Sequence, residues 1–144
     1  MQTQNLKNHS RLIFMFHGVV VIGLLLVFIG SCVNMCQTCS AGSGYYSATL
    51  ISALSFITLI LAFYARAFSL KAQDRAIRAE ENFRHFIATG KPLDSKLTIR
   101  QIIGLRFASD EEFVALAQRA IAENLSEKQI KQAIQNWKGD FYRV

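Results

Sequence analysis

Two apolar stretches decide the fold of this chain: LIFMFHGVVVIGLLLVFIGSCV at residues 12–33 and YYSATLISALSFITLILAFY at residues 45–64. About 20 residues of α-helix cross a hydrocarbon core roughly 30 Å thick, so each stretch is long enough to span a membrane. The segment between them, NMCQTCSAGSG at residues 34–44, is uncharged and too short to hold a domain. Because backbone groups inside a bilayer must be hydrogen-bonded internally, we predict a two-span helical hairpin.

The charged residues are distributed unevenly along the 144 residues. Residues 12–65 contain no Lys, Arg, Asp or Glu, whereas all ten acidic residues lie between Asp74 and Asp140. Charged residues make up 18% of the chain, so a soluble protein is not expected to leave such a gap. The distribution indicates a membrane segment followed by a charged helical region.

Basic residues beside the apolar stretches predict the orientation in the membrane. They are Lys7, Arg11, Arg66, Lys71, Arg75 and Arg78, while the connecting loop has none. Because cytoplasmic flanks carry an excess of Lys and Arg, we predict a multi-pass protein of the cytoplasmic (inner) membrane with both termini cytoplasmic. A signal peptide ending at a lipidated Cys32 is the weaker interpretation, since the apolar run exceeds the usual length of about 7–15 residues.

The second stretch is rich in small and hydroxylated residues, which allow helices to approach closely in lipid. They are Ser47, Ala48, Thr49, Ser52, Ala53, Ser55, Thr58 and Ala62. We expect this face to pack against the first span, and docking of another membrane protein is the alternative.

Residues 66–89 contain no Gly or Pro and are predicted to continue the second span as a cytoplasmic helix. Their apolar positions, spaced by 4, 4, 3, 4 and 3 residues, form a stripe close to a heptad repeat. These positions are Phe68, Ala72, Ala76, Ala79, Phe83 and Phe86. We expect the stripe to pack on the neighbouring domain, with a homodimer seam as the alternative. Glu80 and Arg84 are spaced for an i,i+4 ion pair.

Three capping boxes mark helix starts in the last third of the chain, each a hydroxyl residue followed three positions later by Glu or Gln. They begin at Thr98, Ser109 and Ser126, and the predicted helices lie near 99–107, 110–123 and 127–137. Asn124 suits the left-handed position that ends the middle helix.

One small core is predicted for these three helices. Its members are Ile99, Ile102, Ile103, Leu105, Phe107, Phe113, Val114, Leu116, Ile121, Ile130, Ile134 and Trp137. A core of this size is marginal alone, so support from the 66–89 helix or from a partner is expected.

The predicted fold class is therefore all-α: a two-span transmembrane hairpin, a second span continuing into a cytoplasmic helix, and a small three-helix C-terminal domain. The predicted segments are 1–11 (cytoplasmic N-terminal segment), 12–33 and 45–65 (spans), 34–44 (external loop), 66–89 (continuing helix) and 90–144 (helical domain).

Cys36 and Cys39 form a CxxC pair one turn after Cys32, a spacing compatible with a disulfide, a redox centre or half of a metal site. A reactive thiol needs a basic neighbour or a helix N-terminus, and a zinc site needs four ligands. The loop offers no basic neighbour and too few ligands for zinc, so a structural disulfide or plain thiols are favoured.

The three histidines are His9, His17 and His85. His17 lies within the first span, where a polar residue is a functional candidate by default. It is also near enough to the end of the span to reach the headgroups, and one such histidine per chain does not ligate a haem from both sides. A redox-active or cofactor-carrying membrane component that uses His17, Cys36 or Cys39 is the alternative function.

The last two predicted helices have helix-turn-helix spacing, and Lys128, Lys131 and Lys138 are possible groove contacts for the second of them. Glu127 and the acidic run at 110–112 weaken the positive field that a nucleic acid needs. A membrane-tethered nucleic-acid binder is therefore the third hypothesis, and nucleic acid is not expected as a partner.

No Ser/His/Asp set, phosphate-binding glycine loop or carboxylate pair can be assembled from the sequence, which favours a non-enzymatic function without cofactor or metal. The leading hypothesis is a membrane-anchored interaction protein or accessory subunit. Its partners would be the lipid bilayer and either another protein or a second copy of the chain. The candidate interaction surface comprises Ala72, Ala76, Ala79, Phe83, Phe86 and Trp137.

Several segments together resemble a family of small bacterial two-span membrane proteins, known as a domain of unknown function, with a C-terminal helical cytoplasmic domain. They are QNLKNHSR before the first span (residues 4–11), KAQDRAIR after the second (71–78), LRFASDEE (105–112), and NWK with YRV near the end (136–138 and 142–144). The resemblance covers nearly the whole chain. It implies the two-span architecture and a bacterial cytoplasmic membrane, but no activity, and the loop cysteines are not part of its pattern.

Overall fold

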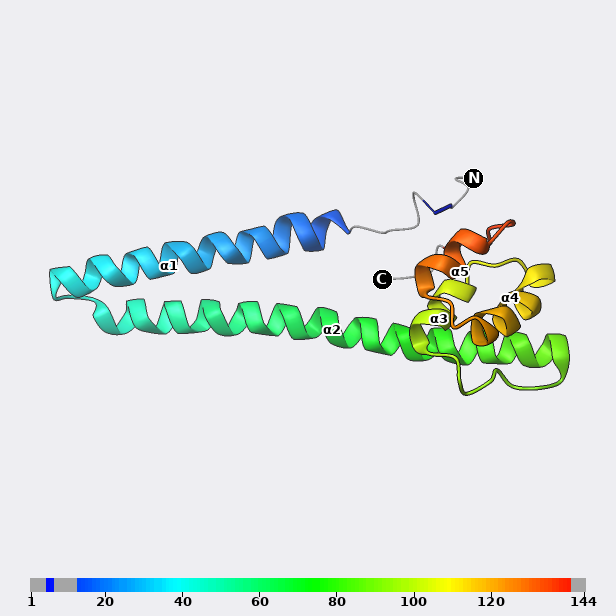
Figure 1. Ribbon diagram of the computed structural model, residues 1–144. Coiled ribbons are helices and arrows are strands. Elements are labelled where there is room, and N and C mark those ends of the chain that lie inside the picture. Colours follow the sequence, from blue (N-terminus) through cyan, green and yellow to red (C-terminus); the bar gives the residue numbers. More distant parts are fainter. Residues whose placement is uncertain (1–4, 7–12, 141–144) are drawn as a thin grey trace. The chain divides into compact units, whose positions relative to one another are not determined.

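The computed structural model describes residues 5–6 and 13–140, and the regular elements in these residues are all helical (Figure 1). They are the π-helix η1 (Met15–Val21), α1 (Ile22–Ala41), α2 (Tyr45–Thr89), α3 (Ile99–Leu105), α4 (Asp110–Ala122) and α5 (Glu127–Ala133). Extended pairing among the described residues is limited to one isolated bridge, between Ala108 and Trp137. The predicted all-α class is confirmed.

The chain divides into two compact units. Of the described residues, 13–69 form one, here called the hairpin unit, and 70–140 with 5–6 form the other, here called the C-terminal unit. The helix α2 contributes to both. Two helical segments, Met15–Ala41 and Tyr45–Thr89, are long and apolar enough to cross a membrane, judged by length and composition. The predicted N-terminal segment 1–11, with His9, Lys7 and Arg11, lies outside the described residues except for positions 5 and 6.

In the hairpin unit, α1 and the first part of α2 run antiparallel and side by side (Figure 1). They are joined by a tight turn in which Gly42 and Gly44 have φ of 71° and 76°, a left-handed conformation that favours glycine. Since α1 continues to Ala41, the connection is shorter than the predicted 34–44 loop. Cys36 and Cys39 therefore lie on a helix.

The contact between the two hairpin helices is polar and small. Ser31, Ser52 and Ser55 are buried there together with Ala48. The hydroxyls of Ser31 and Ser55 lie 3.0 Å apart, and the Ser52 hydroxyl donates to the Ser31 carbonyl oxygen at 3.0 Å. Part of the small face of α2 thus packs on α1 as predicted, whereas Ser47 and Ala53 of that face are exposed. Most large apolar side chains of the unit are exposed.

In the C-terminal unit, the three predicted capping boxes form at the starts of α3, α4 and α5. At α3, for example, the Thr98 hydroxyl accepts from the Gln101 backbone N–H at 3.3 Å, and the Gln101 side chain accepts from the Thr98 N–H at 2.9 Å. Asn124 adopts the predicted left-handed conformation after α4, with φ of 49°. These local signals were sufficient to place all three helix starts.

The last helix is shorter than predicted, because α5 ends at Ala133 and the chain becomes extended at Ile134. The extended segment returns along the start of α4: the backbone N–H of Ser109 donates to the carbonyl of Asn136 at 3.0 Å. Trp137 thereby packs on the Phe107 ring, with 5.3 Å between ring centroids. A helix continued to 137 would lose this packing.

The core of the C-terminal unit is apolar and includes a contribution from α2. Phe107, Phe113, Leu105 and Ile130 are its largest fully buried side chains. Ile77 of α2 belongs to the same cluster. This is the support from the 66–89 helix that the small predicted core required. Of the predicted core residues, Ile103, Val114, Ile121 and Trp137 are only partly buried against it. Ile99, also predicted for the core, is half-buried and does not belong to the cluster.

The prediction that the α2 stripe packs on the neighbouring domain is wrong. Its residues in the C-terminal unit are exposed, namely Ala72, Ala76, Ala79, Phe83 and Phe86. The side of α2 that holds α3–α5 instead carries Ile77 and Glu81, both buried. Hydrophobic spacing cannot reveal this arrangement, because charged residues take part in the contact and are satisfied there by ion pairs.

Candidate interaction surface

The outward side of α2 in the C-terminal unit presents large apolar side chains to solvent. Phe83 is 65% exposed, Phe86 50% and Ile87 70%. Ala72, Ala76 and Ala79 continue this exposed side toward the start of the unit. Trp137, the sixth residue of the predicted surface, is half-buried against Phe107 and belongs to the core edge instead. The structure thus brings together five of the six predicted residues on one helix side.

A groove of about 600 Å³ lies beside this side of α2. Phe83 and Ile87 form part of its wall, with Phe113 from α4. Charged side chains form most of the remaining lining: Glu80, Glu81, Arg84, Arg106, Asp110, Lys138 and Asp140. Exposed aromatic area beside charged groups is the composition typical of a protein-binding surface.

Arg84 organises the charged part of the groove. Its Nε donates to Asp110 Oδ1 at 2.6 Å, one Nη to Glu81 Oε2 at 3.1 Å, and the other Nη to the carbonyl of Ala108 at 2.8 Å. The guanidinium also stacks over the Phe113 ring, 4.2 Å from its centroid. One side chain therefore fastens α2 to the start of α4 by ion pairs, a backbone hydrogen bond and a cation–π contact.

The two carboxylates on Arg84 are in different environments. Burial raises the pKa of Glu81, although Arg84 opposes the shift by hydrogen bonding and charge. The hydrogen bond from Arg84 lowers the pKa of Asp110, which is exposed at the start of α4. The difference follows from desolvation, which penalises the charged form only where water is excluded.

A second set of ion pairs fastens the segment after α5. Arg106 pairs with Asp140 at 2.9 Å and with Glu80 of α2 at 3.5 Å. Lys138 lies 3.5 Å from Asp110. Each cation of the groove thus has an acidic partner. Such a network positions the surrounding elements.

Two residues with structural roles were missed by sequence reasoning. Arg84 was assigned a local pair with Glu80, but it contacts Glu81 and Asp110 instead. Glu112, predicted only as a capping residue, also accepts from the backbone N–H groups of Gln135 and Asn136, both at 3.1 Å. A single acidic side chain therefore caps α4 and holds the chain after α5. The sequence contains no signal for the second contact.

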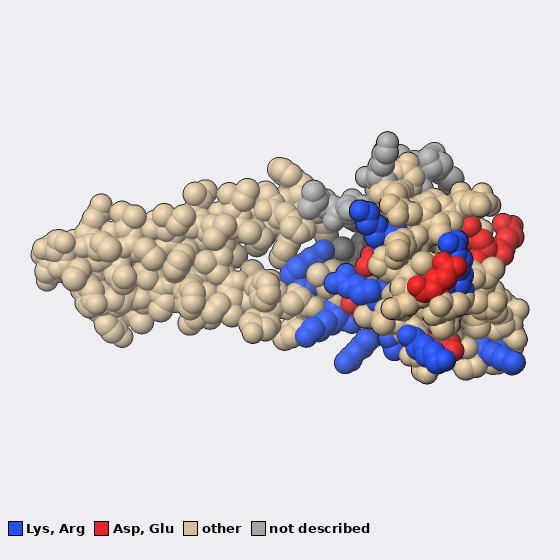
Figure 2. All heavy atoms as spheres, viewed as in Figure 1, with Lys and Arg blue, Asp and Glu red and all other residues tan. Residues whose placement is uncertain are grey.

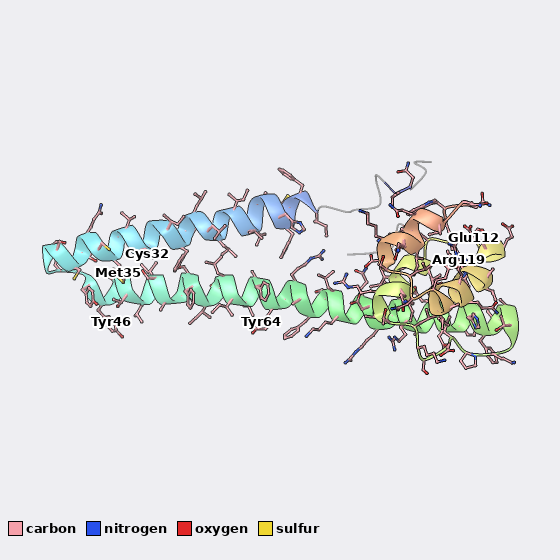
Figure 3. The ribbon with its side chains drawn as sticks, viewed as in Figure 1. Cys32, Met35, Tyr46, Tyr64, Glu112 and Arg119 are labelled. Atoms are coloured by element: carbon pink, nitrogen blue, oxygen red, sulfur yellow. The ribbon has the colours of Figure 1, made fainter. Side chains whose placement is uncertain are left out.

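The cysteine and histidine candidates of the hairpin unit are not assembled into a site. Cys36 and Cys39 are exposed, unbonded thiols on α1 (Figure 3 labels the neighbouring Cys32 and Met35). His17 lies in η1, with Nδ1 3.0 Å from the carbonyl oxygen of Ile13. About 19 residues separate His17 from Cys36, roughly 28 Å along a helix. No three His, Cys, Asp or Glu side chains gather as a metal site among residues 5–6 and 13–140.

His85 is also occupied by its own surroundings. Its Nδ1 lies 3.2 Å from the hydroxyl of Thr89, the last residue of α2, and 2.8 Å from the carbonyl oxygen of Lys91, just after the helix. The ring makes an edge contact with Phe113. These contacts secure the turn that begins at Gly90, where φ is 72°.

Two of the three lysines considered as contacts to a nucleic-acid groove make contacts within the protein. Lys131 is buried, pairs with Glu127 at 2.7 Å and lies over the Phe107 ring. Lys138 lies beside Asp110. The helix itself, α5, has only seven residues. These contacts reduce the positive charge available to a phosphate backbone.

These features define an all-helical chain with an apolar hairpin and a small capped helical unit. The chain belongs to a family of unknown function (DUF6526), whose family model matches residues 1–144. No curated protein and no solved structure matches it.

Proposed function

We propose that this chain is an integral membrane protein whose hairpin unit crosses a bacterial cytoplasmic membrane twice and whose C-terminal unit serves as a non-enzymatic docking module on the cytoplasmic side. It would act as an interaction protein or accessory subunit of a larger membrane complex. The observation that carries the proposal is the reversed burial in the hairpin unit, where serines are inside and large apolar side chains are outside.

Lipid explains this reversal better than water does. In water the exposed apolar surface of the hairpin would cost free energy at about 25 cal/mol per Å². In a bilayer the same surface is at no disadvantage, and helix association depends on close packing and interhelical hydrogen bonds. The Ser31–Ser55 and Ser52–Ser31 contacts are of this kind. Tyr46 and Tyr64 lie near the two ends of the apolar part of α2, where an aromatic belt is expected (Figure 3).

The basic residues support the orientation. Arg66, Lys71, Arg75 and Arg78 follow the apolar part of α2, and the turn at residues 42–44 carries no charge. Figure 2 shows the same distribution on the visible surface, with no charged residue over most of the hairpin unit and both signs on the C-terminal unit. By the positive-inside rule, the C-terminal unit stays in the cytoplasm.

The exposed aromatic side of α2 supports the docking role. Phe83, Phe86 and Ile87 are at least half exposed although the same unit buries Phe107 and Phe113 almost completely. Anchors of this type, next to charged groups, dominate the energetics of many protein interfaces.

Single-cysteine labelling in intact cells tests the membrane topology. A chain that keeps only Cys39 is compared with a cysteine-free chain carrying Ala115→Cys, which lies exposed on α4. An impermeant thiol reagent should label Cys39 from outside and Ala115→Cys only after the cells are permeabilised. Labelling of Ala115→Cys in intact cells, or recovery of the chain in the supernatant of a detergent-free high-speed spin, would refute the proposal.

Purification in mild detergent tests the docking role. The expected result is co-purification of a protein partner or a second copy, identified after crosslinking. A lone monomer that turns over a small molecule would show that the non-enzymatic assignment is wrong.

A further inference from the structure

The uncovered side of α2 has the geometry of a helix–helix seam. Ile77 faces α3–α5, and each residue turns about 100° around the helix axis, so Phe86 lies about 180° away and Phe83 about 120° away. The elements α3–α5 therefore leave this side open. Phe83 and Phe86 are exposed in spite of their size.

The residues on this side occupy the core positions of two heptads. Ala76 and Phe83 fall at position a, while Ala72, Ala79 and Phe86 fall at position d. The phenylalanines supply apolar area, and the alanines allow the helices to approach. A second helix with the same pattern would cover both aromatic rings along the whole stripe.

The flanking charges select a parallel pairing of identical helices. With Ala76 and Phe83 at a, Arg75 is at position g and Glu80 at position e, five residues later. In a parallel coiled coil a g residue faces the e residue five positions later in the other helix, so Arg75 meets Glu80 of the partner subunit in two symmetric pairs. The next such pair, Asn82 with Ile87, brings no like charges together. An antiparallel pairing would place g against g and would lose this complementarity.

Glu80 is accessible for such a contact. Its side chain is 61% exposed, and its ion pair within the chain, to Arg106, is long at 3.5 Å. Arg106 has a shorter pair with Asp140, at 2.9 Å. Glu80 can therefore turn toward a neighbouring helix without leaving Arg106 unpaired.

We propose that residues 72–87 of α2 form a parallel seam with the same residues of a second copy, so that the protein is a homodimer. The proposal rests on the proposed membrane insertion, because two copies inserted by the same rule present α2 in the same direction and at the same height. Two heptads are short for an isolated coiled coil. Confinement of both copies to one membrane raises their effective concentration and compensates for the short seam.

Cysteine crosslinking in isolated membranes tests the seam on the full chain. The background is cysteine-free (Cys32→Ala, Cys36→Ser, Cys39→Ser), with one cysteine introduced at Ala72 or Ala79 of the seam. Lys71 and Arg78, each exposed and adjacent to a seam position, give the matched controls. Oxidation should produce a disulfide-linked dimer from the two seam positions, several-fold more than from the controls.

The outcomes separate the two proposals. Recovery of the chain outside the membrane fraction would refute the membrane insertion. Recovery in the membrane with no dimer, with equal dimer at all four positions, or with an adduct to a different protein would refute the homodimer seam only. A native fluorescence spectrum of Trp137, the single tryptophan, confirms that each variant is folded.

A charge swap tests the parallel register. In the Ala79→Cys chain, Glu80→Arg should lower crosslinking several-fold, because the new arginine lies opposite Arg75 of the second copy. Arg75→Glu should have the same effect, because the new glutamate lies opposite Glu80. The double variant should restore crosslinking. Glu111→Arg makes the same charge change on exposed α4 and should have no effect. A double variant no better than the singles would overturn the Arg75–Glu80 pairing.

Discussion

The two units of this chain bury opposite kinds of side chain. The hairpin unit buries Ser31, Ser52 and Ser55 and exposes its large apolar residues, whereas the C-terminal unit buries Phe107 and Phe113. Figure 2 shows the corresponding surfaces, without charged residues over most of the hairpin unit and charged over the C-terminal unit. One helix, α2, follows both patterns along its length. Lipid and water favour opposite burial patterns, so this contrast is the one expected if the hairpin unit lies in a membrane, as proposed, and the C-terminal unit in water.

The forces that hold the units together differ accordingly. In the C-terminal unit, burial of apolar side chains drives folding, and ion pairs around Arg84 fix the position of α2. In the hairpin unit, hydrogen bonds between serines and close helix approach hold the two helices together. Matched substitutions in the two units should therefore have unequal effects.

Removal of a phenylalanine ring should give the largest difference. Phe107→Ala leaves a cavity in a closed core and should lower the free energy of unfolding by about 3–5 kcal/mol. Phe63→Ala, on the exposed side of the hairpin unit, leaves no cavity in a core and should leave the free energy of unfolding unchanged. Denaturant titration in detergent, followed by Trp137 fluorescence, measures both. Similar losses in the two variants would contradict the comparison.

Introduction of a charge should affect the hairpin unit more than the C-terminal unit, the reverse of the order for removal of a phenylalanine ring. Leu54→Arg places a guanidinium near the middle of the apolar part of α2 and should disfavour insertion by about 3 kcal/mol. Gln118→Arg adds the same group to the exposed side of α4 and should have little effect. The fraction of chain in the membrane pellet measures the effect. Normal insertion of Leu54→Arg would show that this position does not face lipid.

Removal of a serine hydroxyl should have smaller and unequal effects. Ser126→Ala removes the cap of α5, where the hydroxyl accepts from Gln129 N–H at 3.4 Å, and should cost about 1 kcal/mol in the C-terminal unit. Ser55→Ala removes one interhelical hydrogen bond, which should cost about 0.6 kcal/mol in the hairpin. Denaturant titration reports the first effect, and the detergent concentration needed to unfold the hairpin reports the second. A larger loss from Ser55→Ala would reverse the expected order.

The smallest effects should come from pH and from the two carboxylates on Arg84. Because the pKa of Asp110 is lowered, its contribution to stability is present at neutral pH and is lost as the pH falls through that lowered value. Because the pKa of Glu81 is raised, its charged form opposes folding at neutral pH, and this cost is relieved as the pH falls.

Two neutral variants separate these contributions. At pH 7, Asp110→Asn should lower stability by less than about 1 kcal/mol, as is usual for an exposed ion pair, and the loss should disappear in acid. Glu81→Gln should lower stability less than Asp110→Asn does at pH 7. The check is Trp137 fluorescence in denaturant between neutral and acid pH. A loss from Asp110→Asn that grows in acid would contradict the assigned sign.

The regular elements were predictable because their signals are local. The two apolar stretches and the capping boxes at Thr98, Ser109 and Ser126 each lie within one segment of sequence, and the structure has helices at those places. The left-handed conformation at Asn124 was predictable for the same reason. Each signal depends only on nearby backbone geometry.

The contacts between elements were less predictable. Spacing placed the Phe83 stripe against the core, but the structure uses Ile77 and the Arg84 ion pairs instead. The early end of α5 depends on Glu112, which binds backbone groups more than 20 residues away. Such pairings depend on tertiary geometry, which hydrophobic periodicity does not contain. The residues of the exposed aromatic side of α2 were therefore identified correctly, but the prediction that they pack on the core was wrong.

Lipid exposure of the hairpin unit can be measured directly with a spin label in liposomes. The label is attached to Leu54→Cys in the cysteine-free chain, with Gln118→Cys as the matched position in the C-terminal unit. We predict that the label at 54 collides more often with oxygen, which concentrates in lipid, than with a water-soluble nickel complex, and that the label at 118 shows the reverse. Preferential collision of the label at 54 with the nickel complex would contradict the proposed lipid exposure of the hairpin unit.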